Sequence, residues 1–187
     1  MMSLDQHKVY HEKQRWEMCA LHALNNIFQD GKAFNKQKLD EICQRLAPST
    51  RPNPHKSMLG LGNYDVNVIM AALQLKECEA VWWDKRRNPS ELNLPNIIGF
   101  IVNTTSPIQF GYVDLPFKRK HWIALRQVDN TYYNLDSKLS KPVVIGSPEE
   151  LLDYLKNGMN LKSWELLLVV SQQVSETRTW LKSSDQL

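Results

Sequence analysis

The chain has 187 residues, of which 42% are apolar and 23% are charged, and its net charge is only +3. This length suits one domain with a single core, and the composition is ordinary for a soluble globular protein. The small net charge excludes a polycation. No nucleic-acid-binding motif accompanies the short basic runs at 85–87 and 118–120, so we expect solvated turns there and no nucleic-acid partner.

The first predicted helix covers 17–29, where apolar residues recur at helical spacing. Its apolar side would face the core, while Asn25 and Asn26 are expected to face outward. Cys19 falls in its first turn, where unpaired N–H groups and the helix dipole favour a thiolate. The structural alternative is a small buried side chain, which is the usual fate of a free cysteine and which position alone favours.

Two further helices are predicted before the strands begin. One covers about 35–46, and Asp65 is placed to cap another that continues to about Gln74. Between them, 47–63 is rich in proline and glycine, which indicates a surface loop.

The rest of the chain changes to strand-like patterns, interrupted by one late helix at about 148–156. β-Branched and aromatic residues predict strands at 80–83, 97–102, 121–128, 132–136 and 164–170. Helices first and then mostly strands predict an α+β fold, in which N-terminal helices pack on a mostly antiparallel sheet. The polar tail after Ser171 is expected to be frayed.

Three cysteines, Cys19, Cys43 and Cys78, form neither an even set nor a CxxC pair. This pattern argues against a disulfide framework and favours a reducing compartment. The first ten residues lack an apolar signal core, and the longest apolar run, 166–170, is too short to span a membrane. We therefore expect a cytoplasmic protein, in which Cys43 and Cys78 are structural.

A nucleophilic Cys19 needs a base, and a predicted β-hairpin offers one. If 129–130 form a two-residue turn, His121 and Asp136 become diagonal neighbours on one face of the sheet, within reach of each other. Asp136 could then hold one ring nitrogen and leave the other to face a thiolate. Asn134 shares this face but lies one step further from His121, and a one-residue shift of register would break the arrangement.

Other residues compete for roles near Cys19. His22, three residues further along the helix, is a rival base, although no carboxylate lies near it in the sequence. Gln14 could donate its amide to an oxyanion, but a merely exposed glutamine explains it as well. The spacing of His7, His11, Cys19 and His22 could in principle hold zinc, but the first two fall in the leader, so we expect no metal and no cofactor.

Five stretches in this order resemble the Josephin family of deubiquitinating cysteine proteases, from about residue 9 to residue 170. They are YHEKQ at 10–14, CALHALNN at 19–26, GNYDVNVIMAAL at 62–73, KHW at 120–122 and YNLDS at 133–137. The second and third, together with AVWWDKRR at 80–87, look most like the small stand-alone Josephin proteins. The resemblance implies one papain-like catalytic domain at 9–170, with flexible ends at 1–8 and 171–187.

The family's motifs carry catalytic roles onto this sequence. The resemblance implies that Cys19 is the nucleophile, His121 the base, Asp136 the orienting residue and Gln14 the oxyanion donor. Other members carry Asn where this chain has Asp136, and a carboxylate can orient an imidazole as well as an amide can. The family also has a helical arm beside the active site, whose place is taken here by 47–63.

The resemblance implies ubiquitin and ubiquitinated proteins as partners, with hydrolysis of the isopeptide bond at the C-terminal glycine of ubiquitin through a thioester. Trp122 could wall a narrow cleft for the ubiquitin tail, although packing in the sheet explains it equally well. A weakly active ubiquitin-binding scaffold and another thioester chemistry, such as acyl transfer, stay open. Some stand-alone relatives are linked to the plasma membrane, where the basic runs could assist peripheral association.

Overall fold

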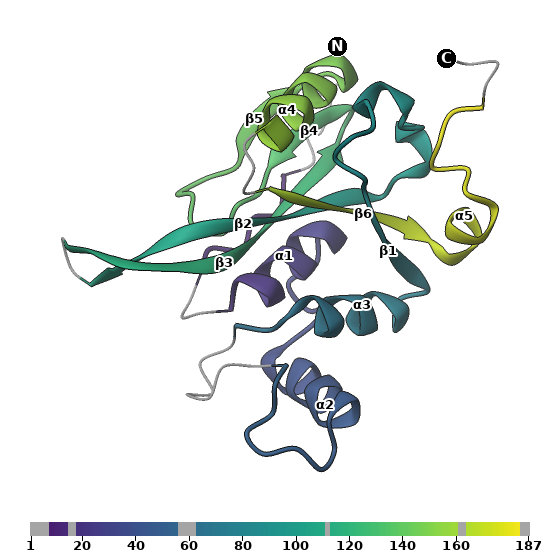
Figure 1. The fold of residues 1–187 in the computed structure, drawn as a ribbon. Helices are drawn as coiled ribbons and strands as arrows, with labels where there is room; N and C mark the ends of the chain where they lie inside the picture. The colour runs from purple at the N-terminus through teal and green to yellow at the C-terminus, as the bar shows by residue number, and fades with distance from the viewer. Residues whose placement is uncertain (1–7, 15–17, 56–62, 111–112, 161–163, 184–187) are drawn as a thin grey trace.

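A computed structural model describes residues 8–14, 18–55, 63–110, 113–160 and 164–183, with the backbone alone for 106–110 and 113–119 (Figure 1). Its centre is a six-stranded, wholly antiparallel sheet of order β1-β6-β2-β3-β4-β5. The strands are β1 (Cys78–Trp82), β2 (Gly99–Phe110), β3 (Val113–Val128), β4 (Thr131–Asn134), β5 (Val143–Gly146) and β6 (Glu165–Ser171). The helices are α1 (Cys19–Phe28), α2 (Lys36–Leu46), α3 (Val66–Gln74), α4 (Pro148–Asn160) and α5 (Gln172–Thr177), with short 3-10 turns at Pro89–Glu91 and Leu94–Asn96.

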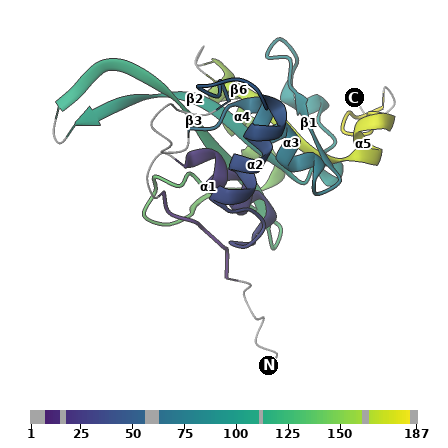
Figure 2. The same cartoon turned by 90° about the horizontal axis from the view of Figure 1, so that it is seen from below.

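The helices form layers on the two sides of this sheet (Figures 1 and 2). α1 and α3 pack on one face, against alternate residues of the central strands such as Ile101 and Ala124. α4 covers the opposite face, where Leu151 and Leu155 pack against the intervening residues, including Val102. The predicted α+β arrangement, with N-terminal helices on an antiparallel sheet, is confirmed.

Buried polar side chains distinguish α1 from an ordinary amphipathic helix. Every residue from Cys19 to Ile27 is buried, including Asn25 and Asn26. The prediction that these two asparagines face outward was therefore wrong. Their amides bond to other segments of the chain, among them the backbone of Phe34 and the carbonyl of Leu135, which satisfies the polar groups without exposing them.

β2 and β3 continue well beyond the predicted strands and form a two-stranded arm that projects from the sheet (Figure 2). The basic run at 118–120 lies in this arm, so the prediction of a turn there was wrong, whereas 85–87 does lie in a turn region. Pro107 weakens the sequence signal for a strand. It is tolerated because β6 pairs with β2 only as far as Asn103, which leaves β2 at an edge.

The end of the described chain differs from the frayed tail expected after Ser171. The Ser171 hydroxyl accepts from Val174 N and caps α5. Beyond α5, the ring of Trp180 packs edge-on against Trp83, with centroids 6.2 Å apart, and Leu181 bridges to Leu92. An aromatic contact over almost a hundred residues of sequence gives no local pattern, so the sequence did not reveal it.

The segment predicted as a surface loop at 47–63 is described as far as residue 55. Residues 47–55 consist of turns and bends and contain no helix. The remainder of that segment, 56–62, lies outside the described residues.

Candidate active site

Cys19 is the first residue of α1, and its side chain is 3% exposed. The N-cap residue, Met18, makes no side-chain hydrogen bond to the backbone N–H groups of the first turn of α1. Partial positive charge at such a position favours a thiolate. The other two cysteines are also buried and, like Cys19, form no disulfide within the described part of the chain, but Cys43 lies in the middle of α2 and Cys78 in β1.

His121 and Asp136 are brought together by the hairpin of β3 and β4. Asp129 and Asn130 both have positive φ, which is the geometry of the predicted two-residue turn, and the predicted register holds from Val128↔Thr131 to Leu125↔Asn134. The ladder of paired strands ends there, yet His121 Nε2 lies 2.7 Å from Asp136 Oδ1.

Asn134 is the last residue of β4, and its side chain bonds to the backbone that follows. Its Oδ1 accepts from the backbone N–H of Asp136 at 2.9 Å, and its Nδ2 donates to the Tyr154 hydroxyl. Asn134 therefore supports the backbone of Asp136, while the partner of the imidazole is the Asp136 carboxylate.

Charge and burial act against each other on His121. Burial lowers the pKa of the imidazole, but the hydrogen bonds and charges of Asp136 and Cys19 outweigh it and raise the pKa to about 8. Burial raises the pKa of the Asp136 carboxyl, whereas the bond from His121 lowers it, and the net pKa is below its usual value. Because Nε2 faces Asp136, Nδ1 is the ring nitrogen left for the Cys19 thiol, which lies within hydrogen-bonding reach.

Gln14 lies beside the segment that carries Asp136. Its backbone N–H donates to Ser137 O at 2.7 Å, and the Ser137 hydroxyl donates to its side-chain Oε1 at 3.4 Å. The structure thus brings Gln14 to the loop after β4, in contact with Ser137, the residue that follows Asp136.

His22, the rival base, has a carboxylate partner after all. Its Nδ1 lies 3.2 Å from Glu12 Oε1, a carboxylate that is close in space although it is not near His22 in the sequence. This contact joins α1 to the segment that precedes it, ten residues earlier in the chain. Helical spacing relates only residues within one helix, so it cannot predict such a contact. Cys19 is among the groups that raise the pKa of His121, which favours His121 as the imidazole partner of the thiol.

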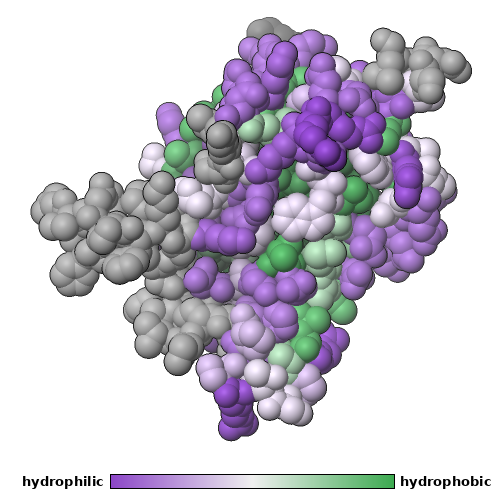
Figure 3. Space-filling model, in the orientation of Figure 1, coloured by the Kyte–Doolittle hydropathy of each residue, from purple (hydrophilic) through white to green (hydrophobic). Residues whose placement is uncertain are grey.

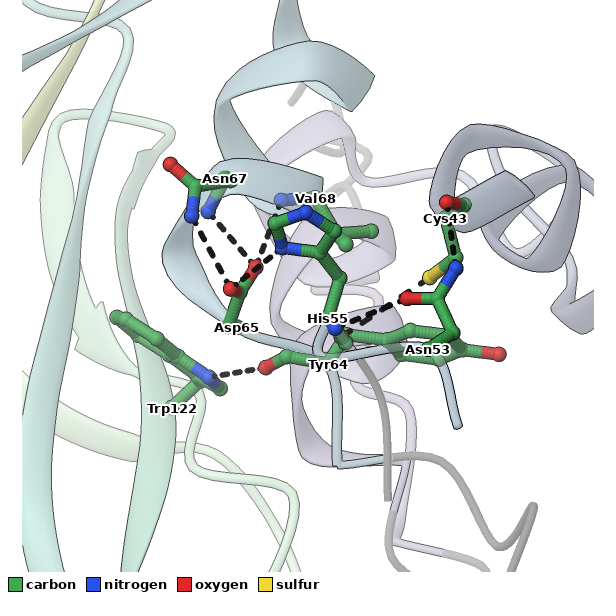
Figure 4. Close-up of polar contacts among 8 residues, drawn as sticks. All are labelled: Cys43, Asn53, His55, Tyr64, Asp65, Asn67, Val68 and Trp122. Carbon is green, nitrogen blue, oxygen red and sulfur yellow. Dashed lines mark hydrogen bonds and ion pairs between the residues drawn. The ribbon is translucent and has the colours of Figure 1, made fainter. Parts of the chain in front are cut away.

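Trp122, the neighbour of His121, packs in the sheet and also borders a surface hollow. It is 2% exposed, and its indole N–H donates to Tyr64 O at 3.0 Å (Figure 4). It also lines a hollow of about 470 Å³, together with the half-exposed Trp82 and the polar Asn103 and Lys120. The indole N–H of Trp122 is thus bonded inside the protein, while the residue also forms part of the wall of this hollow.

The segment that holds Trp122 is itself fixed by Asp65 (Figure 4). The Asp65 carboxylate caps the first turn of α3 and accepts from His55 Nδ1 at 2.8 Å, while the backbone N–H of Asp65 donates to His55 O. Asn53 ties the same loop to α2 through Cys43 O at 2.7 Å. The described part of the loop is therefore bonded to the helices that support Tyr64.

The residues considered for zinc have other partners. His11 Nε2 bonds to Asp136 O and His22 contacts Glu12, while His7 lies outside the described residues. Within the part of the chain that is described, no group of three or more His, Cys, Asp or Glu side chains is placed to hold a metal ion.

The surface offers little continuous apolar area on the face drawn in Figure 3, which is mostly hydrophilic with small separate apolar patches. In the basic turn at 85–87, Arg86 is paired with Asp84 and Arg87 with Glu91, so much of its charge is balanced locally. Across the described helices, none is long and apolar enough to cross a bilayer.

Comparisons with known proteins agree with these motifs. The family model described as Josephin matches residues 14–170. Josephin-2 from Mus musculus is 53% identical over 176 residues, covering 94% of this chain and 93% of the relative. Josephin-2 from Homo sapiens is 53% identical over 175 residues, with the same coverage, and a Josephin-like protein from Drosophila melanogaster is 48% identical over 168 residues, covering 89% and 76%.

Proposed function

This chain belongs to the Josephin family and has its papain-like α+β fold, and from that premise we propose that it is a deubiquitinase. It hydrolyses the isopeptide bond at the C-terminal glycine of ubiquitin, with Cys19 as nucleophile, His121 as base and Asp136 as orienting residue. The observation that carries the proposal is the contact of His121 with Asp136 at 2.7 Å, with the thiol at the start of α1 within reach of the same ring.

In the first half of the reaction, the Cys19 thiolate attacks the carbonyl carbon of the ubiquitin C-terminal glycine and forms a C–S bond. The carbonyl oxygen takes the negative charge. His121, protonated in the ion pair, gives its proton to the lysine amine as the C–N bond breaks. The amine leaves, and ubiquitin remains attached to Cys19 as a thioester.

In the second half, His121 is neutral and can accept a proton from water. The water oxygen bonds to the thioester carbon, and the C–S bond breaks with return of the electron pair to Cys19. Ubiquitin leaves as its C-terminal acid, which loses its remaining proton to solvent and becomes a carboxylate, and His121 holds the proton that it took from water. Asp136 keeps the ring oriented throughout and stabilises its charged form, as its short contact with Nε2 supports.

The oxyanion would be held by two donors: the side-chain amide of Gln14 and the backbone N–H of Cys19. The hydrogen bond from Gln14 N to Ser137 O supports a fixed position for Gln14 near the reaction. Such donors contribute most when they are aimed in advance at the position where charge develops.

The tail of ubiquitin ends in two glycines, which have no side chains, so it suits a narrow cleft that leads to the thiol. Trp122 would wall that cleft, and the hollow that it lines with Trp82 supports this role. Ubiquitin and ubiquitinated proteins are thus the proposed partners, and 9–170 is the proposed catalytic domain.

We also propose a cytoplasmic location, on the grounds of cysteine usage, and peripheral membrane association through the basic runs, on the grounds of their charge.

The test is to incubate the protein with ubiquitin vinyl sulfone and to map the adduct by mass spectrometry. We expect one ubiquitin on Cys19, loss of the adduct in Cys19→Ala, and an unchanged adduct in Cys78→Ala, which removes another buried thiol. Labelling of Cys43 or Cys78 would contradict the site. Binding of ubiquitin without an adduct and without cleavage of di-ubiquitin would indicate a scaffold, and a thioester released only to an added amine would indicate a transferase.

A further inference from the structure

The leader at 10–14 is bonded to α1 along its length. The backbone N–H of Glu12 donates to Asn26 Oδ1 at 2.7 Å, and Asn26 in turn donates through Nδ2 to Leu135 O at 2.8 Å. Tyr10 N bonds to Gln29 Oε1 at 3.0 Å. An otherwise extended segment is thus held against the helix that begins with Cys19.

The other side of the same leader is bonded to the loop that carries Asp136. Nε2 of His11 lies 2.9 Å from Asp136 O, and because a carbonyl can only accept, this nitrogen carries the proton. Gln14 N donates to Ser137 O at 2.7 Å. The leader therefore joins the helix of the proposed nucleophile to the loop of the proposed orienting residue.

Glu12 lies at the centre of the leader that joins α1 to the Asp136 loop, and its carboxylate faces α1. Its Oε1 lies 3.2 Å from His22 Nδ1, and its Oε2 accepts from Asn25 Nδ2 at 2.7 Å. His22 and Asn25 are 2% and 1% exposed, so the carboxylate meets buried partners on two successive turns of α1. Burial raises the pKa of Glu12, but the bonds from His22 and Asn25 outweigh it, and the net pKa is lowered.

The position of Gln14 depends on this contact because only one residue separates it from Glu12. Two residues of extended chain span at most about 7 Å, so a fixed Glu12 limits where the Gln14 amide can lie. The bond from the Ser137 hydroxyl to Gln14 Oε1 then sets the orientation of the amide. Displacement of a catalytic donor by about 1 Å can cost about 100-fold in rate.

We propose that Glu12 is a positioning residue, whose carboxylate, held by His22 and Asn25, fixes the oxyanion donor Gln14 relative to Cys19. The proposal rests on the hydrolase function proposed above. The alternative is that Glu12 only ties down the leader and that the reaction does not depend on it.

A double-mutant cycle separates these two roles. Glu12→Ala, Gln14→Ala and the double variant are compared for kcat and KM with ubiquitin aminomethylcoumarin, and for alkylation of Cys19 by iodoacetamide. Alkylation reports the Cys19–His121 pair and needs no oxyanion donor. We expect each single variant to lose about 100-fold in kcat at nearly unchanged KM, the double variant to lose little more, and all three to alkylate Cys19 at the wild-type rate.

Additive losses, an active Glu12→Ala or a matching loss of alkylation would each overturn the proposal while wild-type turnover stands. Absence of wild-type turnover and of the vinyl sulfone adduct would overturn the proposed function, and this inference with it. Glu176→Gln, on the exposed side of α5, is the matched control and should behave as the wild type. If Glu12→Ala does not fold, Glu12→Asp is used with the same expectations, because its shorter side chain cannot reach both partners.

Discussion

The imidazole of His121 meets the carboxylate of Asp136 through Nε2, and Asp136 Oδ1 accepts a second hydrogen bond, from Lys138 N at 2.9 Å. The carboxylate is therefore fixed by the backbone on one side while it holds the ring on the other. Because a carboxylate accepts, Nε2 is the protonated nitrogen, and in the proposed reaction Nδ1 exchanges a proton with Cys19. The pH dependence of the reaction should follow from this arrangement.

We predict that the alkaline limb of the kcat/KM profile lies near pH 8, where His121 loses the proton that the leaving amine needs. Replacing Asp136 by Asn keeps an orienting group but removes the charge that raises the pKa of His121. The alkaline limb should then move to lower pH by about one unit or more. Profiles of both proteins measure the shift, and a limb that stays in place would show that Asp136 does not tune the imidazole.

Substitution of two buried histidines, His121 in β3 and His22 in α1, tests which of them is the base. His121→Ala should lower kcat by about 10²–10⁴-fold and should also slow the alkylation of Cys19, because the ion pair is lost. His22→Ala should leave alkylation at the wild-type rate, since the His22 ring is held by Glu12 at 3.2 Å. Alkylation followed by peptide mapping distinguishes them, and the opposite result would make His22 the base.

The raised pKa of His121 also predicts how stability depends on pH. An unfolded histidine titrates near 6.5 and the folded one near 8, so the folded state binds the proton more tightly. This contribution, about 2 kcal/mol, is complete below about pH 6.5 and is lost as pH rises through 8. Urea unfolding at pH 6 and pH 9 should show a larger decrease for the wild type than for Asp136→Asn, and equal decreases would contradict the linkage.

The turn and register of the hairpin, although not the full length of its strands, could be predicted because their information is local. The Asp129–Asn130 turn fixes the register, and the alternation of side chains does the rest. The strand pairing ends at Asn134, but Leu135 N still donates to Ala124 O in the same register, and the Asn134 side chain accepts from the backbone N–H of Asp136. The sequence therefore predicted the contact of His121 with Asp136 correctly, although the paired strands end before Asp136.

What the sequence did not reveal depends on contacts between distant segments. Asn25 and Asn26 have polar side chains, so helical periodicity assigned them to the solvent side. In the structure they are buried because the leader and the loops around them supply hydrogen-bond partners. Glu12 is missed for the same reason, since nothing in the leader itself indicates that its carboxylate faces α1. Family motifs, which record residues without their contacts, marked the stretch but not its role.

The C-terminal segment gives the last prediction. Trp180 packs against the buried Trp83, over which Arg87 also lies, and Lys182 N bonds to Glu91 O, so the segment covers apolar surface. Trp180→Ala should lower the free energy of unfolding by about 2 kcal/mol, less than for a fully buried tryptophan because Trp180 is partly exposed. Gln173→Ala, on exposed α5, is the matched control and should change it by less than about 0.5 kcal/mol. Urea denaturation measures both, and equal stability of wild type and Trp180→Ala would mean that residues after Ser171 contribute nothing to the fold and form the flexible end that their polar composition predicts.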